Sequence, residues 1–62
     1  MENIIDWAYD EAATYLPDLE ANGPVSAEDL VNLLRNRYYD MFSEPTTKEV
    51  REVLLLVAKE FV

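Results

Sequence analysis

The sequence predicts an all-α protein, a compact three-helix bundle that forms a single domain over residues 1–62. Apolar residues recur at spacings of three and four in three separate segments, which is typical of amphipathic helices. Two breaks, Asn22-Gly23-Pro24 and Ser43-Glu44-Pro45, separate these segments. No segment alternates between apolar and polar residues as a half-buried strand would. A chain of this length allows one small core, which short loops and three helices can enclose.

The first helix is predicted over residues 2–16. Pro17 disfavours helical backbone at the residue before it, so we expect the helix to end at Leu16. The apolar stripe centres near Ala8, which places Trp7 on the outer face among acidic residues. The alternative is that the helix is tilted and Trp7 caps one end of the core. The residues expected to face the core are Met1, Ile4, Ile5, Ala8, Ala12, Tyr15 and Leu16.

The second helix is predicted over residues 27–42. Ser26 can cap its free amides, and Asp29 stands three residues further on, where it can complete a capping box. Leu33 and Tyr39 fall outside the core stripe. That stripe consists of Ala27, Leu30, Val31, Leu34, Tyr38 and Met41, with Phe42 at its edge.

The third helix is predicted over residues 47–61. Thr46 and Glu49 fit a capping box, with Thr46 as the cap. Two large apolar residues, Leu55 and Leu56, point away from the main stripe, and Leu55 lines up with Ala58 and Val62. Either this helix is central in the bundle, or these residues form a seam between two copies of the chain. The main stripe consists of Val50, Val53, Leu54, Val57 and Phe61.

The composition argues against an enzyme. The chain has no cysteine and no histidine, so it lacks a thiolate nucleophile, a cysteine zinc site and the commonest general base. Ser26 and Ser43 have no histidine to activate them. We therefore expect a non-catalytic protein that needs no cofactor.

The charge is strongly negative, with 13 acidic and 5 basic residues and a net charge of −8. This charge disfavours direct binding to nucleic acid or to an anionic membrane and favours basic partners. Six of the acidic residues lie in residues 1–23, which contain no basic residue. The acidic N-terminus is unlike a signal peptide, and no apolar run is as long as a membrane span, so a cytoplasmic location is expected.

Three short helices also suit a helix-turn-helix reader of DNA. Its recognition helix would need basic and amide side chains, and the second predicted helix offers Asn32, Arg35, Asn36 and Arg37. The net charge of −8 opposes this interpretation, since phosphates would be repelled.

Residues 18–29 have the length of a calcium loop and resemble that of the EF-hand family. The resemblance implies a divalent-cation site, although position three is Glu and position twelve the shorter Asp, which favours magnesium or weak calcium binding. The alternative is an acidic loop between helices in which Ser26 serves as a cap. The residues at loop positions one, three, five, six, nine and twelve are Asp18, Glu20, Asn22, Gly23, Ser26 and Asp29.

These features together predict a small acidic module that binds a protein with a basic surface and modulates or inhibits it. If that partner binds nucleic acid, the module would compete as a phosphate mimic, as small phage-type inhibitors of similar size and charge do. The alternative is a self-associating assembly module, a homodimer that pairs through Leu55, Leu56 and Val62. The residues expected to contact the partner are Glu2, Asp6, Trp7, Asp10, Glu11 and Tyr39.

Overall fold

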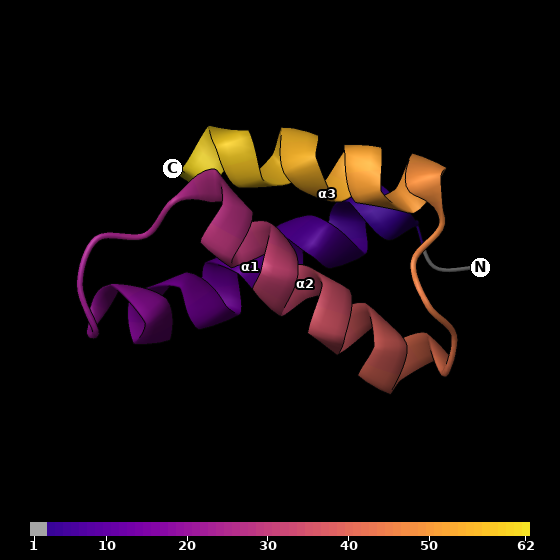
Figure 1. Cartoon of the computed structure of the whole chain (residues 1–62), viewed down its shortest axis with the longest axis horizontal. Helices are drawn as coiled ribbons and strands as arrows, with labels where there is room; N and C mark the ends of the chain where they lie inside the picture. Colours follow the sequence, from indigo (N-terminus) through magenta and orange to yellow (C-terminus); the bar gives the residue numbers. More distant parts are fainter. Residues whose placement is uncertain (1–2) are drawn as a thin grey trace.

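Three helices and two short loops make up the computed structural model, which describes residues 3–62. α1 spans Ile4–Glu20, α2 spans Ala27–Phe42 and α3 spans Lys48–Phe61. Each helix packs against the other two, and α2 crosses in front of α1 while α3 lies along the top of the molecule (Figure 1). The predicted three-helix bundle is confirmed. Within residues 3–62, no helix is long and apolar enough to cross a membrane.

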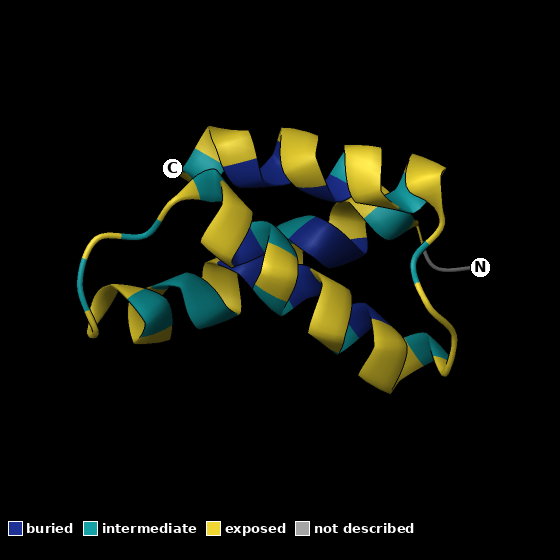
Figure 2. Cartoon of the chain, in the orientation of Figure 1, coloured by how far each residue is buried: buried dark blue, intermediate teal, exposed yellow. Residues whose placement is uncertain are grey.

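The core lies where the three helices meet. Leu30, Leu34 and Leu54 are fully buried and form its centre. Three alanines, Ala8, Ala12 and Ala58, are fully buried around this centre. The buried surfaces face inward on all three helices (Figure 2). The complete buried set is Trp7, Ala8, Ala12, Leu30, Leu34, Tyr38, Leu54, Val57 and Ala58.

The first helix is longer at its C-terminal end than the sequence predicts. Pro17 lies inside α1, which continues to Glu20, so the expected end at Leu16 is wrong. The extra turn brings Leu19 against the core, and the Pro17 carbonyl accepts a hydrogen bond of 3.1 Å from the Ala21 amide. The packing of this turn therefore outweighs the tendency of Pro17 to disfavour helical backbone at the residue before it. At the other end, the Asn3 side chain caps the helix.

The start of α2 is confirmed in detail. The Ser26 hydroxyl accepts a hydrogen bond from the Asp29 amide, and the Asp29 carboxylate accepts one from the Ser26 amide, both at 3.1 Å. The helix ends at Phe42, as expected, and Ser43 follows in the left-handed conformation with φ of 57°. These reciprocal bonds satisfy amides that a helix start otherwise leaves open.

The cap of α3 differs from the prediction by one residue. Thr47, not Thr46, is the cap, and its hydroxyl accepts a hydrogen bond of 3.2 Å from the Val50 amide. The expected capping box between Thr46 and Glu49 is therefore wrong. The Thr46 carbonyl instead accepts a hydrogen bond of 2.9 Å from Nη1 of Arg51, which ties the loop to the first turns of α3.

Trp7 is buried, so its predicted place on the outer face is wrong and the alternative, a place in the core, is correct. Its ring is 5% exposed and lies edge-on to two aromatic rings of α2, at centroid distances of 5.9 Å from Tyr38 and 5.5 Å from Phe42. The physical reason is that α1 faces both α2 and α3, which widens its buried stripe until Trp7 falls inside it. Trp7 therefore belongs to the core and offers no surface to a partner.

Three other assignments to the inside or the outside are corrected. Ile5 and Met41, expected in the core, are 48% and 54% exposed. Ala58, expected in an outer stripe with Leu55 and Val62, is fully buried. A helix in a small bundle turns only part of its circumference inward, and packing decides which part. Met1, a further predicted core residue, lies outside the described residues.

Candidate binding surfaces

The predicted partner surface on α1 is reduced to two exposed carboxylates. Asp6 and Asp10 are exposed and lie one helical turn apart. Glu2 lies outside the described residues, and Trp7 is buried. Tyr39 is exposed but lines a pocket with residues of α2, of the loop after it and of α3, and no residue of α1 belongs to that pocket.

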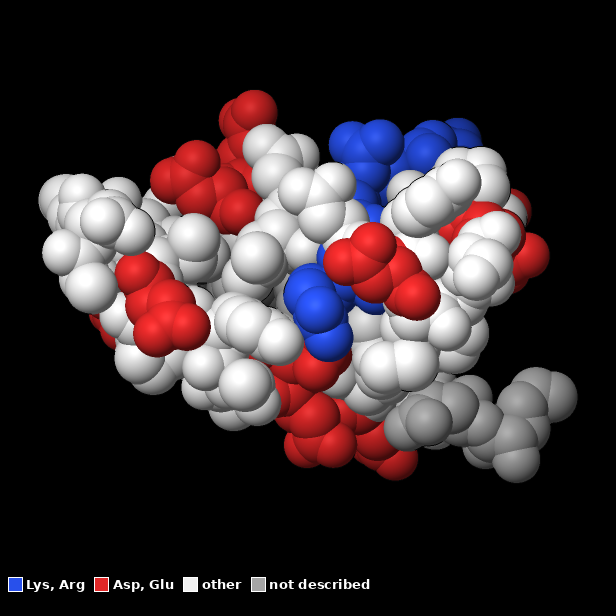
Figure 3. All heavy atoms as spheres, turned by 90° about the horizontal axis from the view of Figure 1, so that it is seen from below, with Lys and Arg blue, Asp and Glu red and all other residues white. Residues whose placement is uncertain are grey.

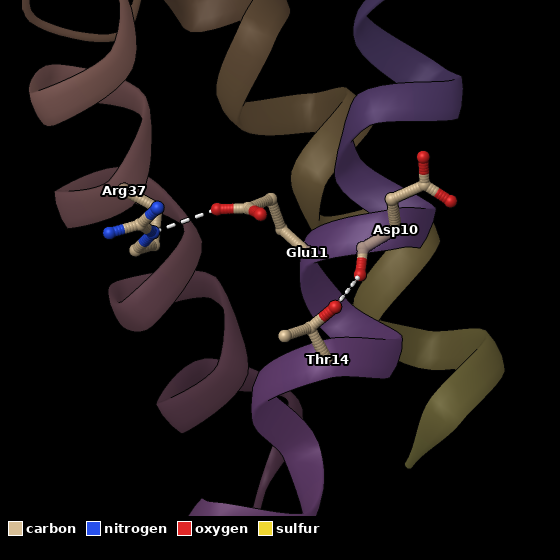
Figure 4. Close-up of polar contacts among 4 residues, drawn as sticks. All are labelled: Asp10, Glu11, Thr14 and Arg37. Atoms are coloured by element: carbon tan, nitrogen blue, oxygen red, sulfur yellow. Dashed lines mark hydrogen bonds and ion pairs between the residues drawn. The ribbon is translucent and has the colours of Figure 1, made fainter.

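Glu11 is engaged inside the bundle. Its Oε1 accepts a hydrogen bond of 2.7 Å from Nε of Arg37 on α2, and only 16% of its side chain is exposed (Figure 4). This hydrogen bond raises the pKa of Arg37. The guanidinium also lies 4.9 Å above the Tyr15 ring, a cation–π geometry. The pair therefore joins α1 to α2 and removes Glu11 from the predicted contact surface.

Asp10 differs from its neighbour Glu11. Figure 4 shows its carboxylate pointing away from Arg37, while its backbone carbonyl accepts a hydrogen bond of 2.8 Å from the Thr14 hydroxyl. The Asp10 side chain therefore stays available to a binding partner.

An apolar groove of about 480 Å³ runs between α1 and α3. Its most exposed apolar residues are Ile5 of α1 and Leu56 of α3, at 48% and 67%. The sequence predicts that Leu56 faces outward but provides no signal that Ile5 would stand opposite it, because the two residues are far apart in the chain. We call this surface the α1–α3 groove; its lining residues are Ile5, Tyr9, Val53, Leu56, Val57, Lys59 and Glu60.

Both helices that form the α1–α3 groove carry exposed acidic side chains. On α3, Glu52 and Glu60 stand one turn before and one turn after Leu56, and both are exposed. On α1, Asp6 directly follows Ile5, and Asp10 follows Tyr9. Lys59 and Glu60 are the charged residues that line the groove itself, so the excess of negative charge near it comes from α1, which carries no basic residue.

The three residues predicted to mediate self-association are all exposed, at 38% for Leu55, 67% for Leu56 and 49% for Val62. They do not form one stripe. Leu56 belongs to the α1–α3 groove, whereas Leu55 and Val62 lie two turns apart on another side of α3. Their exposure contradicts the alternative that α3 is central and buried on both sides, and their role in pairing remains a prediction.

A second open pocket, also of about 480 Å³, lies between α2 and the start of α3. It is polar, and two of the chain's five basic residues, Arg35 and Arg51, line it. We call it the arginine pocket; its residues are Asn32, Arg35, Asn36, Tyr39, Pro45, Thr46 and Arg51. Tyr39, predicted to join the acidic surface, belongs here instead.

Residues 18–29 do not form an EF-hand loop. Asp18 and Glu20 belong to the last turn of α1, and the Asp29 carboxylate accepts the capping bond from Ser26. Among residues 3–62, no group of three acidic side chains lies close enough together to hold a metal ion. The helix that continues through Pro17 removes the loop geometry that the resemblance requires.

The charged surface is divided among several places (Figure 3). Red acidic atoms lie in separate groups over the face shown, whereas blue basic atoms gather at its upper right edge and near its centre. The molecule therefore presents local surfaces of either sign despite its net charge of −8.

Comparison with known proteins adds no assignment to these surfaces. No protein-family model, no curated protein and no solved structure matches the chain. The α1–α3 groove, the arginine pocket and the outer side of α3 are therefore the features from which a function can be argued.

Proposed function

We propose that the protein is a non-catalytic binding module whose α1–α3 groove receives an amphipathic, basic helix of a partner protein. The observation that carries this proposal is an exposed apolar groove between two helices that carry exposed acidic side chains. A helix that lays its apolar face into a groove is a recurrent mode of peptide recognition.

The apolar contribution comes from Ile5 and Leu56. Both side chains are about half exposed or more, at 48% and 67%, and stand on opposite sides of the groove. A partner Leu or Phe that fills the space between them would gain roughly 1.5–3 kcal/mol from burial. This contact replaces Trp7 as the expected anchor.

The electrostatic contribution comes from the exposed acidic side chains of α1 and α3. Asp6 and Asp10 on α1 and Glu52 and Glu60 on α3 would attract lysine and arginine side chains beside the partner's apolar face. Such complementarity mainly accelerates association and selects basic partners. Where the partner's basic surface normally holds nucleic acid, occupation by this module would block it.

The proposal can be tested with a fluorescently labelled helical peptide of leucine and lysine, in a fluorescence anisotropy titration. We expect Leu56→Glu to weaken binding at least tenfold, since it places a charge in the apolar floor. The matched control is Leu55→Glu, an equivalent change on an exposed leucine outside the groove, which should bind like the parent.

The electrostatic part has its own variants in the same titration. Asp6→Asn combined with Asp10→Asn should weaken binding and reduce its dependence on salt, whereas Glu28→Gln on α2 should change little. A peptide with glutamate in place of lysine should not bind. Equal binding of both peptides, or equal losses in Leu56→Glu and Leu55→Glu, would refute the groove as the site.

Self-association through α3 is the second candidate, favoured by the exposure of Leu55 and Val62. Lys48 and Arg51 flank Leu55 on this side of α3, so two copies would have to place acidic residues against them. Size-exclusion chromatography with light scattering at high micromolar concentration tests this candidate. We expect a dimer that Leu55→Glu converts to monomer; a strict monomer, or a dimer that the substitution leaves intact, counts against it.

A further inference from the structure

We infer that the arginine pocket binds the phosphoryl group of a small, ring-bearing phosphate such as a nucleoside monophosphate. The pocket lies between α2 and the start of α3 and is separate from the α1–α3 groove. Its volume of about 480 Å³ falls within the range of small-molecule sites. The inference is independent of the proposed function.

The first argument is charge. Arg35 and Arg51 both line the pocket, and none of its lining residues is acidic. Among residues 3–62, the only ion pair joins Arg37 to Glu11, so no carboxylate neutralises either pocket arginine. In a chain with 13 acidic residues, two guanidinium groups that face one cavity without a carboxylate partner favour an external anion.

The second argument is geometry. Arg35 projects from the middle of α2 and Arg51 from the first turns of α3, so the pocket collects positive charge from two helices. The hydrogen bond of 2.9 Å from Nη1 of Arg51 to the Thr46 carbonyl fixes this guanidinium against the loop. Its other N–H donors remain for a ligand, and a guanidinium can bind phosphate oxygens in pairs.

The third argument is the neutral part of the lining. Tyr39 is 58% exposed, and its ring offers a face on which a planar group can stack. Asn32 and Asn36 stand one turn apart on α2, and each carries both a donor and an acceptor for the edge of a heterocycle. The pocket thus provides a charged part for phosphate and an uncharged part for a ring.

The net charge of −8 favours a small anion over a nucleic-acid polymer as the ligand. At physiological ionic strength, charges are screened over about 8 Å, so a small anion in the pocket is little affected by distant carboxylates. A nucleic-acid polymer would extend beyond the pocket over the surface of a chain that holds 13 acidic residues. A mononucleotide therefore fits the pocket where DNA or RNA does not.

The test is a titration of the ¹⁵N-labelled protein, followed by ¹H–¹⁵N NMR spectra in low-salt buffer, with three probes: inorganic phosphate, adenosine 5′-monophosphate and adenosine. We expect saturable shifts in residues 32–39 and 45–51 with both phosphates. The monophosphate should bind about tenfold more tightly than inorganic phosphate, because a ring stacks on Tyr39. Adenosine alone should cause no saturable shift.

The variants separate the two parts of the pocket. Arg35→Gln and Arg51→Gln should each weaken the binding of both phosphates about tenfold. Arg35→Lys should retain part of the affinity. Tyr39→Ala should reduce the affinity for the monophosphate to that for inorganic phosphate. The matched control is Lys59→Gln, which removes a cation from the α1–α3 groove and should change nothing here.

Three results would overturn the inference. One is the absence of saturable shifts with both phosphates in the folded parent protein. Another is unchanged affinity in Arg35→Gln and Arg51→Gln, provided their spectra show that they are folded. The third is binding of adenosine as tight as that of the monophosphate, which would mean that the phosphoryl group does not contribute to binding.

Discussion

The indole of Trp7 contributes to the core through its ring area and not through a hydrogen bond. It lies edge-on to Tyr38 and Phe42, yet its Nε1–H has no hydrogen-bond partner among the described residues. A buried donor without a partner costs about 1–3 kcal/mol. Burial of the large ring outweighs this cost, so the aromatic cluster holds α1 against α2 by apolar contact.

This arrangement predicts that Trp7→Phe is tolerated far better than Trp7→Ala. Phenylalanine keeps most of the ring contact and removes the unpaired N–H. Alanine leaves a cavity that costs about 3–5 kcal/mol, comparable with the entire stability of a domain of this size. Urea unfolding followed by circular dichroism at 222 nm measures both variants, with Tyr39→Phe on the exposed surface as the control. Equal losses in Trp7→Phe and Trp7→Ala would show that the indole N–H is needed.

A second residue-scale prediction concerns Tyr38 and pH. Burial of its ring, together with its hydrogen bond of 3.2 Å to the Glu44 carboxylate, raises the pKa of Tyr38 above its usual value of 10.0. Because the folded state holds this proton more tightly than the unfolded state, the stabilisation is complete below about pH 10 and is lost as pH rises through the folded pKa. The free energy of unfolding should therefore fall above pH 10, and less steeply in Tyr38→Phe. Identical slopes in the two proteins would contradict the prediction.

At the scale of helices, local signals predicted α2 and only part of α1 and α3. The capping box of Ser26 and Asp29 and the break after Phe42 are both encoded within a few residues, so the bounds 27–42 are correct. The end of α1 depends on Leu19 meeting the core, which the local preference of Pro17 does not reveal. Thr46 and Thr47 are adjacent residues of the same type, and the sequence pattern favoured the wrong one as the cap of α3.

The candidate surfaces were predictable only where they lie on one helix. Helical periodicity correctly places Leu55, Leu56 and Tyr39 on the outside. Leu33, which it also assigns outside the core stripe, is partly buried and packs against the core. The α1–α3 groove and the arginine pocket each combine residues from two helices, and the Glu11–Arg37 pair spans 26 positions of the chain. Such partners depend on how the helices cross, which periodicity within one helix does not determine.

The continuation of α1 through Pro17 yields a prediction at this scale. Proline in a helix interior removes one backbone hydrogen bond and strains the preceding turn, at a cost of about 3 kcal/mol. Pro17→Ala should therefore stabilise the protein by about 1–2 kcal/mol, since the added freedom of the unfolded chain offsets part of the gain. Thermal unfolding should show a higher midpoint. Pro24→Ala, in the loop between α1 and α2, is the control and should be neutral or slightly destabilising.

For the whole molecule, the net charge does not reveal that two surfaces differ in chemical character. α3 contributes Leu56 and Glu60 to the α1–α3 groove and Arg51 to the arginine pocket. A basic protein and a small anion could therefore bind at the same time on different sides of one helix. The net charge of the chain alone favours a basic protein as ligand and gives no indication that a small anion could bind.

The same charge predicts how stability depends on salt. Thirteen acidic residues on a body of 33 × 19 × 17 Å repel one another, and among residues 3–62 one ion pair, between Arg37 and Glu11, offsets this repulsion. Salt screens the many repulsions more than it weakens one half-buried pair, so the net effect on folding should be favourable. Raising NaCl from 20 mM to 500 mM should increase the free energy of unfolding by on the order of 1 kcal/mol. Asp6→Asn combined with Asp10→Asn should be more stable than the parent in 20 mM NaCl and gain less from added salt, whereas stability that falls with salt would mean that attractive charge pairs dominate the fold.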